Sequence, residues 1–175
     1  MGKQAMIPGL IEEPQAVFSE DRRYRYYLSR PFALSGRSIC WVMLNPSTAD
    51  EDHNDPTVRR CIGFASDYRW PDQGHCGRMH VLNLFALRST DPSRLAEADD
   101  PIGPDNDDWI GSVCADSDLV VCAWGVHGDY LKRGDAVKQM LRERGHQLWC
   151  LGTTSSGEPR HPLYVASGTP FQELR

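Results

Sequence analysis

Two asparagines and a histidine are the residues best suited to chemistry in this chain. Asn45 directly follows the apolar run at residues 39–44, Asn83 lies inside the run at 80–85, and His161 lies in a late polar loop. Amide side chains can read the hydrogen-bonding edge of a ligand, and an imidazole can exchange a proton near neutral pH. Such a set could bind a polar ligand through several hydrogen bonds.

Further polar and small residues stand just past the same apolar runs. The additional candidates for ligand binding are Pro46, Ser47, Thr48, Arg88, Gly125, His127 and Arg160. Ligands of open α/β sheets bind outside the carboxyl ends of the strands. We therefore expect Asn45, Asn83 and His161 to share one pocket at that edge, with Arg160 and His127 at its rim offering positive charge to a phosphate.

Each of the three leading residues also has a structural interpretation. Asn45 could end its strand in an Asx turn or cap a short helix. An amide buried at Asn83 without partners would cost about 1–3 kcal/mol, so it either bonds to neighbouring backbone or faces a ligand. His161 precedes a proline and could be an ordinary loop histidine.

Alternating strands and helices must position these residues. Four continuously apolar runs indicate strands covered on both faces, at residues 39–44, 80–85, 119–124 and 147–151. Helix signals lie between them, at residues 55–64, 104–113 and 133–144, where Asp55 and Pro56 begin the first helix and Gly145 ends the third. This order predicts a three-layer α/β/α sandwich with a four-stranded, mainly parallel sheet.

The N-terminal part completes the predicted fold. Aromatic and polar residues alternate at 23–34, which favours an antiparallel edge strand or hairpin. The length of 175 residues suits a single domain over residues 1–175. Residues 1–14 lack the features of a secretory signal, and no apolar run reaches the roughly 18 residues that span a bilayer, so we expect a cytoplasmic protein without membrane contact.

Composition and motifs exclude several kinds of site. The net charge of −5 argues against a broad surface for duplex DNA. Six cysteines without a C-x-x-C pair are expected to be buried thiols, with no zinc or iron–sulfur site. The acidic stretch at 50–55 begins like a calcium loop, but Asp55 replaces the required glycine and Cys61 the required glutamate, so no metal is expected. No phosphate-binding loop, dinucleotide motif or hydrolase elbow is present, and we expect no cofactor.

Two resemblances add to this interpretation. The ordered motifs RYYLSR, VMLNPSTAD, DPTVRRCIGFA, LNLFALRSTDP, DPIGPDND, AWG and LGTTSSGEPRHPLY closely resemble a bacterial and phage family, the domain of unknown function 1643, over about residues 23–164. The motifs LNPST, VLNLFALRST and RHPLY resemble, more distantly, those of the uracil-DNA glycosylase superfamily. That resemblance implies the same sandwich, with Asn45 positioning the attacking water, Asn83 pairing with the extruded base and His161 stabilising charge on the departing base.

Three departures from the glycosylase pattern bear on the substrate. Ser47 stands where that superfamily has glycine, Leu163 stands where it has serine, and no apolar wedge loop is evident. We therefore expect a glycosylase-like enzyme acting on a nucleobase, nucleotide or modified base, small or single-stranded rather than duplex. The alternative is a non-catalytic module that binds a nucleotide or modified base in the same pocket. The sequence does not determine the oligomeric state.

Overall fold

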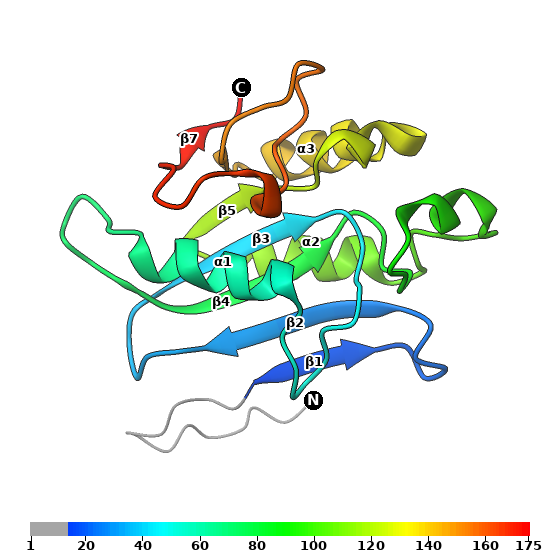
Figure 1. The fold of residues 1–175 in the computed structure, drawn as a ribbon, viewed down its shortest axis with the longest axis horizontal. Helices are drawn as coiled ribbons and strands as arrows, with labels where there is room; N and C mark the ends of the chain where they lie inside the picture. The colour runs from blue at the N-terminus through cyan, green and yellow to red at the C-terminus, as the bar shows by residue number, and fades with distance from the viewer. Residues whose placement is uncertain (1–13) are drawn as a thin grey trace.

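The computed structural model describes residues 14–175, which form a seven-stranded mixed sheet with the order β1-β2-β4-β3-β5-β6-β7 (Figure 1). Its central strands are parallel to one another: β4 (Cys76–Asn83), β3 (Arg37–Met43), β5 (Leu119–Cys122) and β6 (Leu148–Cys150). They occupy the four apolar runs, so the prediction of a parallel centre is confirmed.

Antiparallel strands flank that centre on both sides. β2 (Arg25–Pro31) is the antiparallel strand expected within residues 23–34 and pairs with β4. β1 (Gln15–Phe18) precedes that segment and forms a hairpin with β2. β7 (Gln172–Glu173) pairs with β6 at the other edge. The prediction of a four-stranded, mainly parallel sheet was therefore only partly correct, because the sheet has seven strands and three of its six strand pairings are antiparallel. A two-residue strand such as β7 carries no periodicity that a sequence could reveal.

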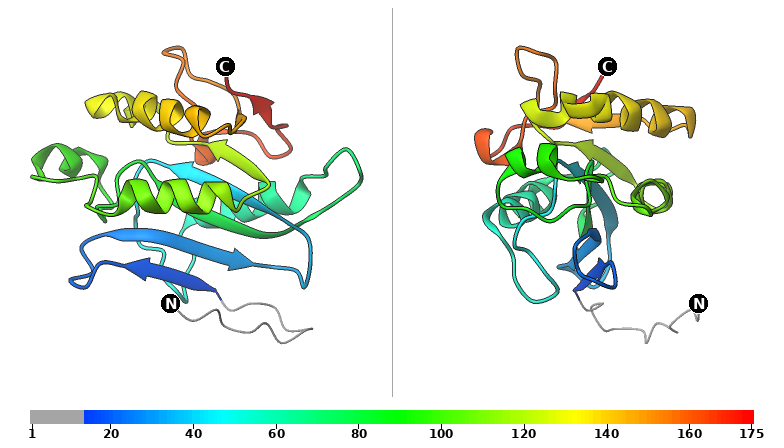
Figure 2. Two further views of the ribbon diagram at one scale, coloured as in Figure 1. Left: turned by 180° about the vertical axis from the view of Figure 1, so that it is seen from behind. Right: turned by 90° about the vertical axis from the view of Figure 1, so that its right-hand side faces the viewer.

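Helices cover both faces of the sheet (Figure 2). α1 (Pro56–Asp67) packs through Val58 and Phe64 on one face, in the cluster that contains Trp41. α2 (Asn106–Ala115) and α3 (Arg133–Glu143) pack on the other face, in the cluster that contains Val42. Because successive β3 side chains enter opposite clusters, the sheet is buried on both sides, as its continuous apolar runs indicated.

The signals at Asp55, Pro56 and Gly145 act as the sequence predicted, whereas Asp105, which precedes α2, makes no capping hydrogen bond through its side chain. The Asp55 side chain accepts a hydrogen bond from the Val58 N–H at 2.8 Å, and Pro56 occupies the first turn of α1. Gly145 follows α3 with φ of +85°, a left-handed conformation that glycine adopts without strain. Short 3₁₀ helices η1 (Pro92–Glu97), η2 (Val126–Lys132) and η3 (Pro162–Tyr164) follow β4, β5 and β6.

The order of the strands leaves a crevice at the carboxyl end of β3. The chain leaves β3 for α1 on one face, whereas it leaves the neighbouring strands β4 and β5 for α2 and α3 on the opposite face. Where adjacent strands send their connections to opposite faces, the space above their ends stays open for a ligand. The candidate site lies here.

Other predictions concern the remainder of the chain. All six cysteines are buried and unpaired, as expected of thiols. Within residues 14–175, no helix is long and apolar enough to cross a membrane, and no three His, Cys, Asp or Glu side chains are grouped as metal ligands. Asp50 caps its own loop, since its carboxylate accepts the backbone N–H groups of Asp52 and His53. The absence of a secretory signal was predicted from residues 1–14, nearly all of which lie outside the described residues.

Candidate functional site

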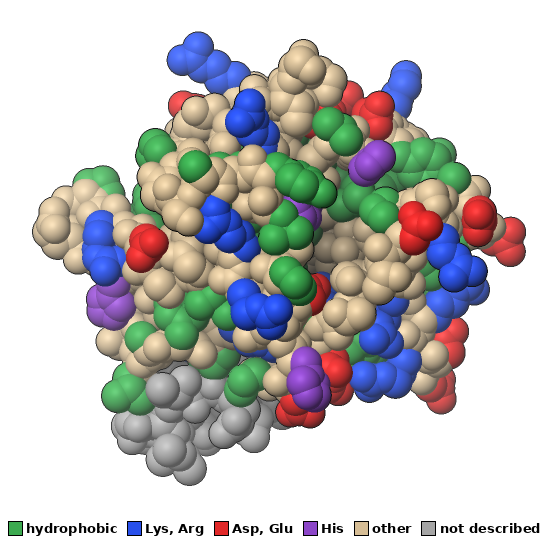
Figure 3. Space-filling view, viewed as in Figure 1, with side chains coloured by type: hydrophobic (Ala, Val, Ile, Leu, Met, Phe, Trp, Pro, Cys, Tyr) green, Lys and Arg blue, Asp and Glu red, His purple; other side chains and the backbone are tan. Residues whose placement is uncertain are grey.

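A cavity of about 910 Å³ opens at the carboxyl edge of the parallel strands. It brings together Asn45 after β3, Asn83 at the end of β4 and His161 after β6, three residues separated by up to 116 positions. The other predicted site residues that line it are Ser47, Thr48, Gly125, His127 and Arg160. Figure 3 shows a hollow near the middle of this face, beside which Lys and Arg side chains gather.

Asn83 is the most deeply buried of the three, with 2% of its surface exposed. Its Oδ1 accepts a hydrogen bond from the Arg25 guanidinium at 3.3 Å. Because a guanidinium can only donate, the amide must turn its oxygen toward Arg25. The Nδ2 group is thereby left with two N–H donors and no hydrogen-bond partner among residues 14–175.

Arg25 lines the cavity as a buried cation, with 3% of its surface exposed. Its other terminal nitrogen donates to the Ala49 carbonyl at 2.8 Å, and its Nε is a buried donor without a partner in the described part of the chain. Burial lowers the pKa of the guanidinium to about 10, and the negative charge of Asp55 opposes that shift. Arg25 therefore remains charged at neutral pH and places positive potential beside Asn83.

Asp55 also lines the cavity, in addition to capping α1. One of its carboxylate oxygens holds the Val58 N–H, and the other has no hydrogen-bond partner among residues 14–175. Sequence reasoning assigned Asp55 only as a helix cap and did not single out Arg25. The cap position could have placed Asp55 at this edge, because α1 follows β3, but no pattern in the sequence signals that Arg25 is buried.

Asn45 connects the loop after β3 with the loop after β4. Its Nδ2 donates to the Ser89 carbonyl at 2.8 Å and to the Pro46 carbonyl at 3.2 Å. The Pro46 carbonyl also accepts the Ser89 N–H at 2.9 Å. The nitrogen of Asn45 is thus used in structure, while its Oδ1 makes no hydrogen bond within residues 14–175 and remains an acceptor at the cavity wall.

His161 is half-buried, and its ring begins the short helix η3. Its Nδ1 accepts the Leu163 N–H at 3.4 Å, so in the neutral ring the proton resides on Nε2. Burial lowers the pKa of the imidazole below 6.5, partly opposed by the Asp55 carboxylate. At neutral pH His161 therefore offers a neutral N–H donor rather than a cation.

The loop after β6 carries His161 and Arg160 and is fixed from within. Trp124 is almost fully buried, and its indole N–H donates to the buried carboxylate of Glu158. The Gly125 N–H donates to the Pro159 carbonyl at 2.8 Å. Gly125 has φ of +78°, and a Cβ there would lie 3.3 Å from the Cβ of His161, so only glycine fits without strain.

Two predicted residues lie outside the cavity. Pro46 does not line it, and its carbonyl accepts the Ser89 N–H of the neighbouring loop. Arg88 points away from it into an adjacent hollow, where one guanidinium nitrogen donates to the Arg22 carbonyl at 3.2 Å. Arg88 does lie at this edge of the sheet, after β4, as its place in the sequence indicated. The direction of its side chain, however, depends on contacts with the neighbouring β1–β2 hairpin.

Comparison with known proteins gives one finding. No curated protein sequence and no solved structure matches this chain. A family model described as "Protein of unknown function (DUF1643)" matches residues 25–163, which include Arg25, Asn45, Asn83 and His161. The chain therefore belongs to the DUF1643 family.

Proposed function

We propose that this protein is a glycosylase-like enzyme that binds a nucleobase, nucleotide or modified base and hydrolyses its N-glycosidic bond. The observation that carries the proposal is that Asn45, Asn83 and His161, which follow or end three different parallel strands, line one cavity. Helices on both faces of a parallel centre also support a uracil-DNA glycosylase-like fold. The resemblance to the uracil-DNA glycosylase superfamily assigns the attacking water to Asn45, the base to Asn83 and the charge on the leaving base to His161.

Base recognition falls to Asn83 and Arg25. The free Nδ2 of Asn83 offers N–H donors, and Arg25 holds its oxygen in place while adding positive potential. A base edge that presents carbonyl oxygens or ring nitrogens as acceptors suits such a wall. The Nδ2 group has no hydrogen-bond partner among residues 14–175, so a base whose edge accepts from it is favoured over one that does not.

Bond cleavage falls to Asn45, Asp55 and His161. We assign the attacking water to the free oxygens of Asn45 and Asp55, with the carboxylate accepting a proton as the water oxygen bonds to the sugar carbon. The base departs with the electron pair of the broken bond. The Nε2–H of His161 donates a hydrogen bond to the negative charge that develops on that base.

A second candidate is a module that binds the same ligand without turnover. It is favoured by one observation, namely that the Nδ2 of Asn45 already holds the Ser89 and Pro46 carbonyls and so has a structural role. The two candidates share the cavity and the base-reading residues. They differ only in whether a bond is broken.

Release of free base separates the two candidates. Nucleosides, nucleotides and modified single-stranded oligonucleotides are incubated with the protein, and free base is measured by chromatography. The enzyme proposal predicts release by the wild type and a fall in turnover for His161→Ala that far exceeds any change in ground-state binding. Binding of a compound that is never cleaved would overturn the enzyme proposal and leave the binding module.

A further inference from the structure

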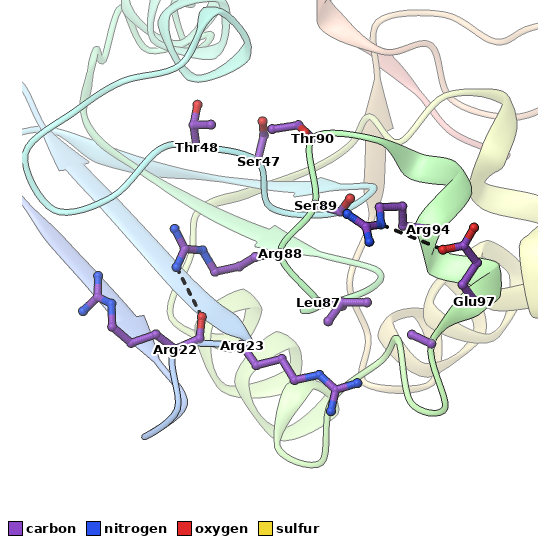
Figure 4. Close-up of a pocket in the computed structure, with 11 residues that line it drawn as sticks. Arg22, Arg23, Ser47, Thr48, Leu87, Arg88, Ser89, Thr90, Arg94 and Glu97 are labelled. Atoms are coloured by element: carbon purple, nitrogen blue, oxygen red, sulfur yellow. Dashed lines mark hydrogen bonds and ion pairs between the residues drawn. The ribbon is translucent and has the colours of Figure 1, made fainter.

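A second hollow, of about 760 Å³, lies beside the cavity and is lined by arginines. Arg22 and Arg23 come from the turn between β1 and β2, Arg88 follows β4, and Arg94 lies on η1 (Figure 4). We call these four residues and the space between them the arginine groove. Glu97 is the acidic residue among those that line it.

The arginine groove and the cavity are continuous. Ser47 and Thr48 from the loop after β3, and Ser89 and Thr90 from the loop after β4, line both hollows. The hydroxyl-bearing loops therefore form the rim between them, and a ligand that extends from the cavity over this rim enters the groove. The sequence alone did not predict the groove, because Arg22 and Arg23 come from the turn of the antiparallel hairpin and not from the end of a parallel strand.

The arginines have few partners of opposite charge. Arg94 and Glu97 are 3.9 Å apart, with both side chains mostly exposed, and Arg22 lies 3.5 Å from Glu51. Exposed ion pairs of this kind contribute little stability. The Nε of Arg88 is a buried donor with no hydrogen-bond partner among residues 14–175, although the rest of its guanidinium stacks on Phe18 and bonds to the Arg22 carbonyl.

In a chain with a net charge of −5, such a concentration of arginines needs an explanation. Arginine binds phosphate oxygens through its planar set of N–H donors, and hydroxyl groups contribute further donors. We propose that the arginine groove binds phosphate groups of the ligand whose base lies in the cavity. This inference rests on the proposed function and narrows the ligand to a nucleotide or a single-stranded nucleic acid, rather than a free base or nucleoside.

Salt-dependent binding tests the inference. The probes are a labelled single-stranded DNA of random sequence and about ten nucleotides, and unlabelled nucleosides and nucleoside 5′-monophosphates as competitors. The variants Arg94→Gln and Arg88→Gln each remove one groove charge. Arg94 is mostly exposed, so its variant keeps the fold even if Arg88→Gln weakens the packing on Phe18. Arg144→Gln is the matched control, because this exposed arginine lies between α3 and β6, at the opposite edge of the sheet.

We expect each groove variant to bind the strand about tenfold more weakly than the wild type. The slope of the logarithm of the association constant against the logarithm of the salt concentration should become shallower by about 0.7 for each phosphate that the variant no longer neutralises. Arg144→Gln should match the wild type. If a nucleoside monophosphate competes better than its nucleoside, the groove binds a single phosphate group. If the monophosphate competes no better than its nucleoside and the strand alone binds more tightly, the groove binds a phosphodiester chain. Unchanged affinity and slope in the groove variants, an equal loss in Arg144→Gln, or failure of every phosphate probe to bind would overturn the inference.

The same assay distinguishes this inference from the proposed function. If nucleosides bind and Asn83→Asp abolishes that binding while the groove variants bind phosphate probes normally, the base site stands and the arginine groove fails. If the groove variants lose strand binding but Asn83→Asp changes nothing, the groove stands and base recognition fails.

Discussion

At the scale of single residues, the protonation state of His161 is central to its assigned role. Burial lowers the pKa of the imidazole below 6.5, while Asp55 partly opposes the shift. Between the folded pKa and pH 6.5 the unfolded chain therefore binds a proton that the folded chain does not. The free energy of unfolding gains a contribution from this residue that is present above pH 6.5 and is lost as the pH falls through the folded pKa.

Unfolding by urea between about pH 7 and about pH 5 measures this contribution. The matched variant is His161→Asn, whose side chain can still accept the Leu163 N–H at the start of η3. We expect the midpoint of the wild type to fall more steeply with decreasing pH than that of the variant. Parallel curves would show that His161 titrates alike in both states.

Asp55 combines a structural and a proposed chemical role in one side chain. Asp55→Asn keeps a good helix cap, whereas Asp55→Ala removes the acceptor for the Val58 N–H. We expect the alanine variant to be less stable than the asparagine variant by about 0.5–2 kcal/mol in chemical denaturation. Both variants should lose base release, because neither retains the carboxylate. Base release at the wild-type rate by Asp55→Asn would exclude the carboxylate from the reaction.

At the scale of elements, the loop from β6 to η3 depends on the contact between Trp124 and Glu158. Glu158→Gln keeps an acceptor for the indole N–H, whereas Glu158→Ala leaves that donor buried and unpaired. We expect Glu158→Ala to lose about 1–3 kcal/mol of unfolding free energy, and Glu158→Gln to lose less. Ligand binding should weaken in parallel, because the loop carries Arg160 and His161. Equal stability of the two variants would mean that packing, not the hydrogen bond, fixes the loop.

The elements that the sequence predicted correctly are those with strong local signals. Continuous apolar runs identified the four parallel strands, and Asp55, Pro56 and Gly145 marked the ends of helices. β7 was missed because a strand of two residues has no periodicity. β1 was missed because its four residues precede the alternating segment that indicated the hairpin.

At the scale of the whole molecule, topology brought together what the sequence could only suggest. Asn45, Asn83 and His161 were predictable because each ends or follows a strand, and parallel strands share one carboxyl edge. Arg25 was not predictable, since charged residues are rarely buried without a specific partner. The arginine groove was not predictable either, because it joins the turn of the antiparallel β1–β2 hairpin to η1, and the pattern of parallel strands does not place that turn.

The reactivity of the cysteine thiols measures whether the core of the whole molecule is intact. All six are buried without disulfides, and burial raises the pKa of the Cys76 thiol to about 11 and those of Cys61 and Cys122 further. A thiol reagent acts on the exposed thiolate. We expect almost no reaction in the folded protein and reaction of six thiols after unfolding in denaturant. Rapid reaction of one or more thiols in the folded protein would contradict this packing.

The central claim is that Asn83 reads a base in the cavity, and Asn83→Asp tests it most directly. Aspartate keeps an oxygen facing Arg25, so the buried guanidinium retains its partner, while the two Nδ2 donors are removed. Calorimetric titration with a panel of nucleobases, nucleosides and 5′-mononucleotides measures binding to both proteins. We expect that at least one compound binds the wild type and binds Asn83→Asp more than tenfold more weakly, a loss of about 1.4 kcal/mol or more. Equal binding to both proteins, or no binding of any compound to the wild type, would contradict the claim.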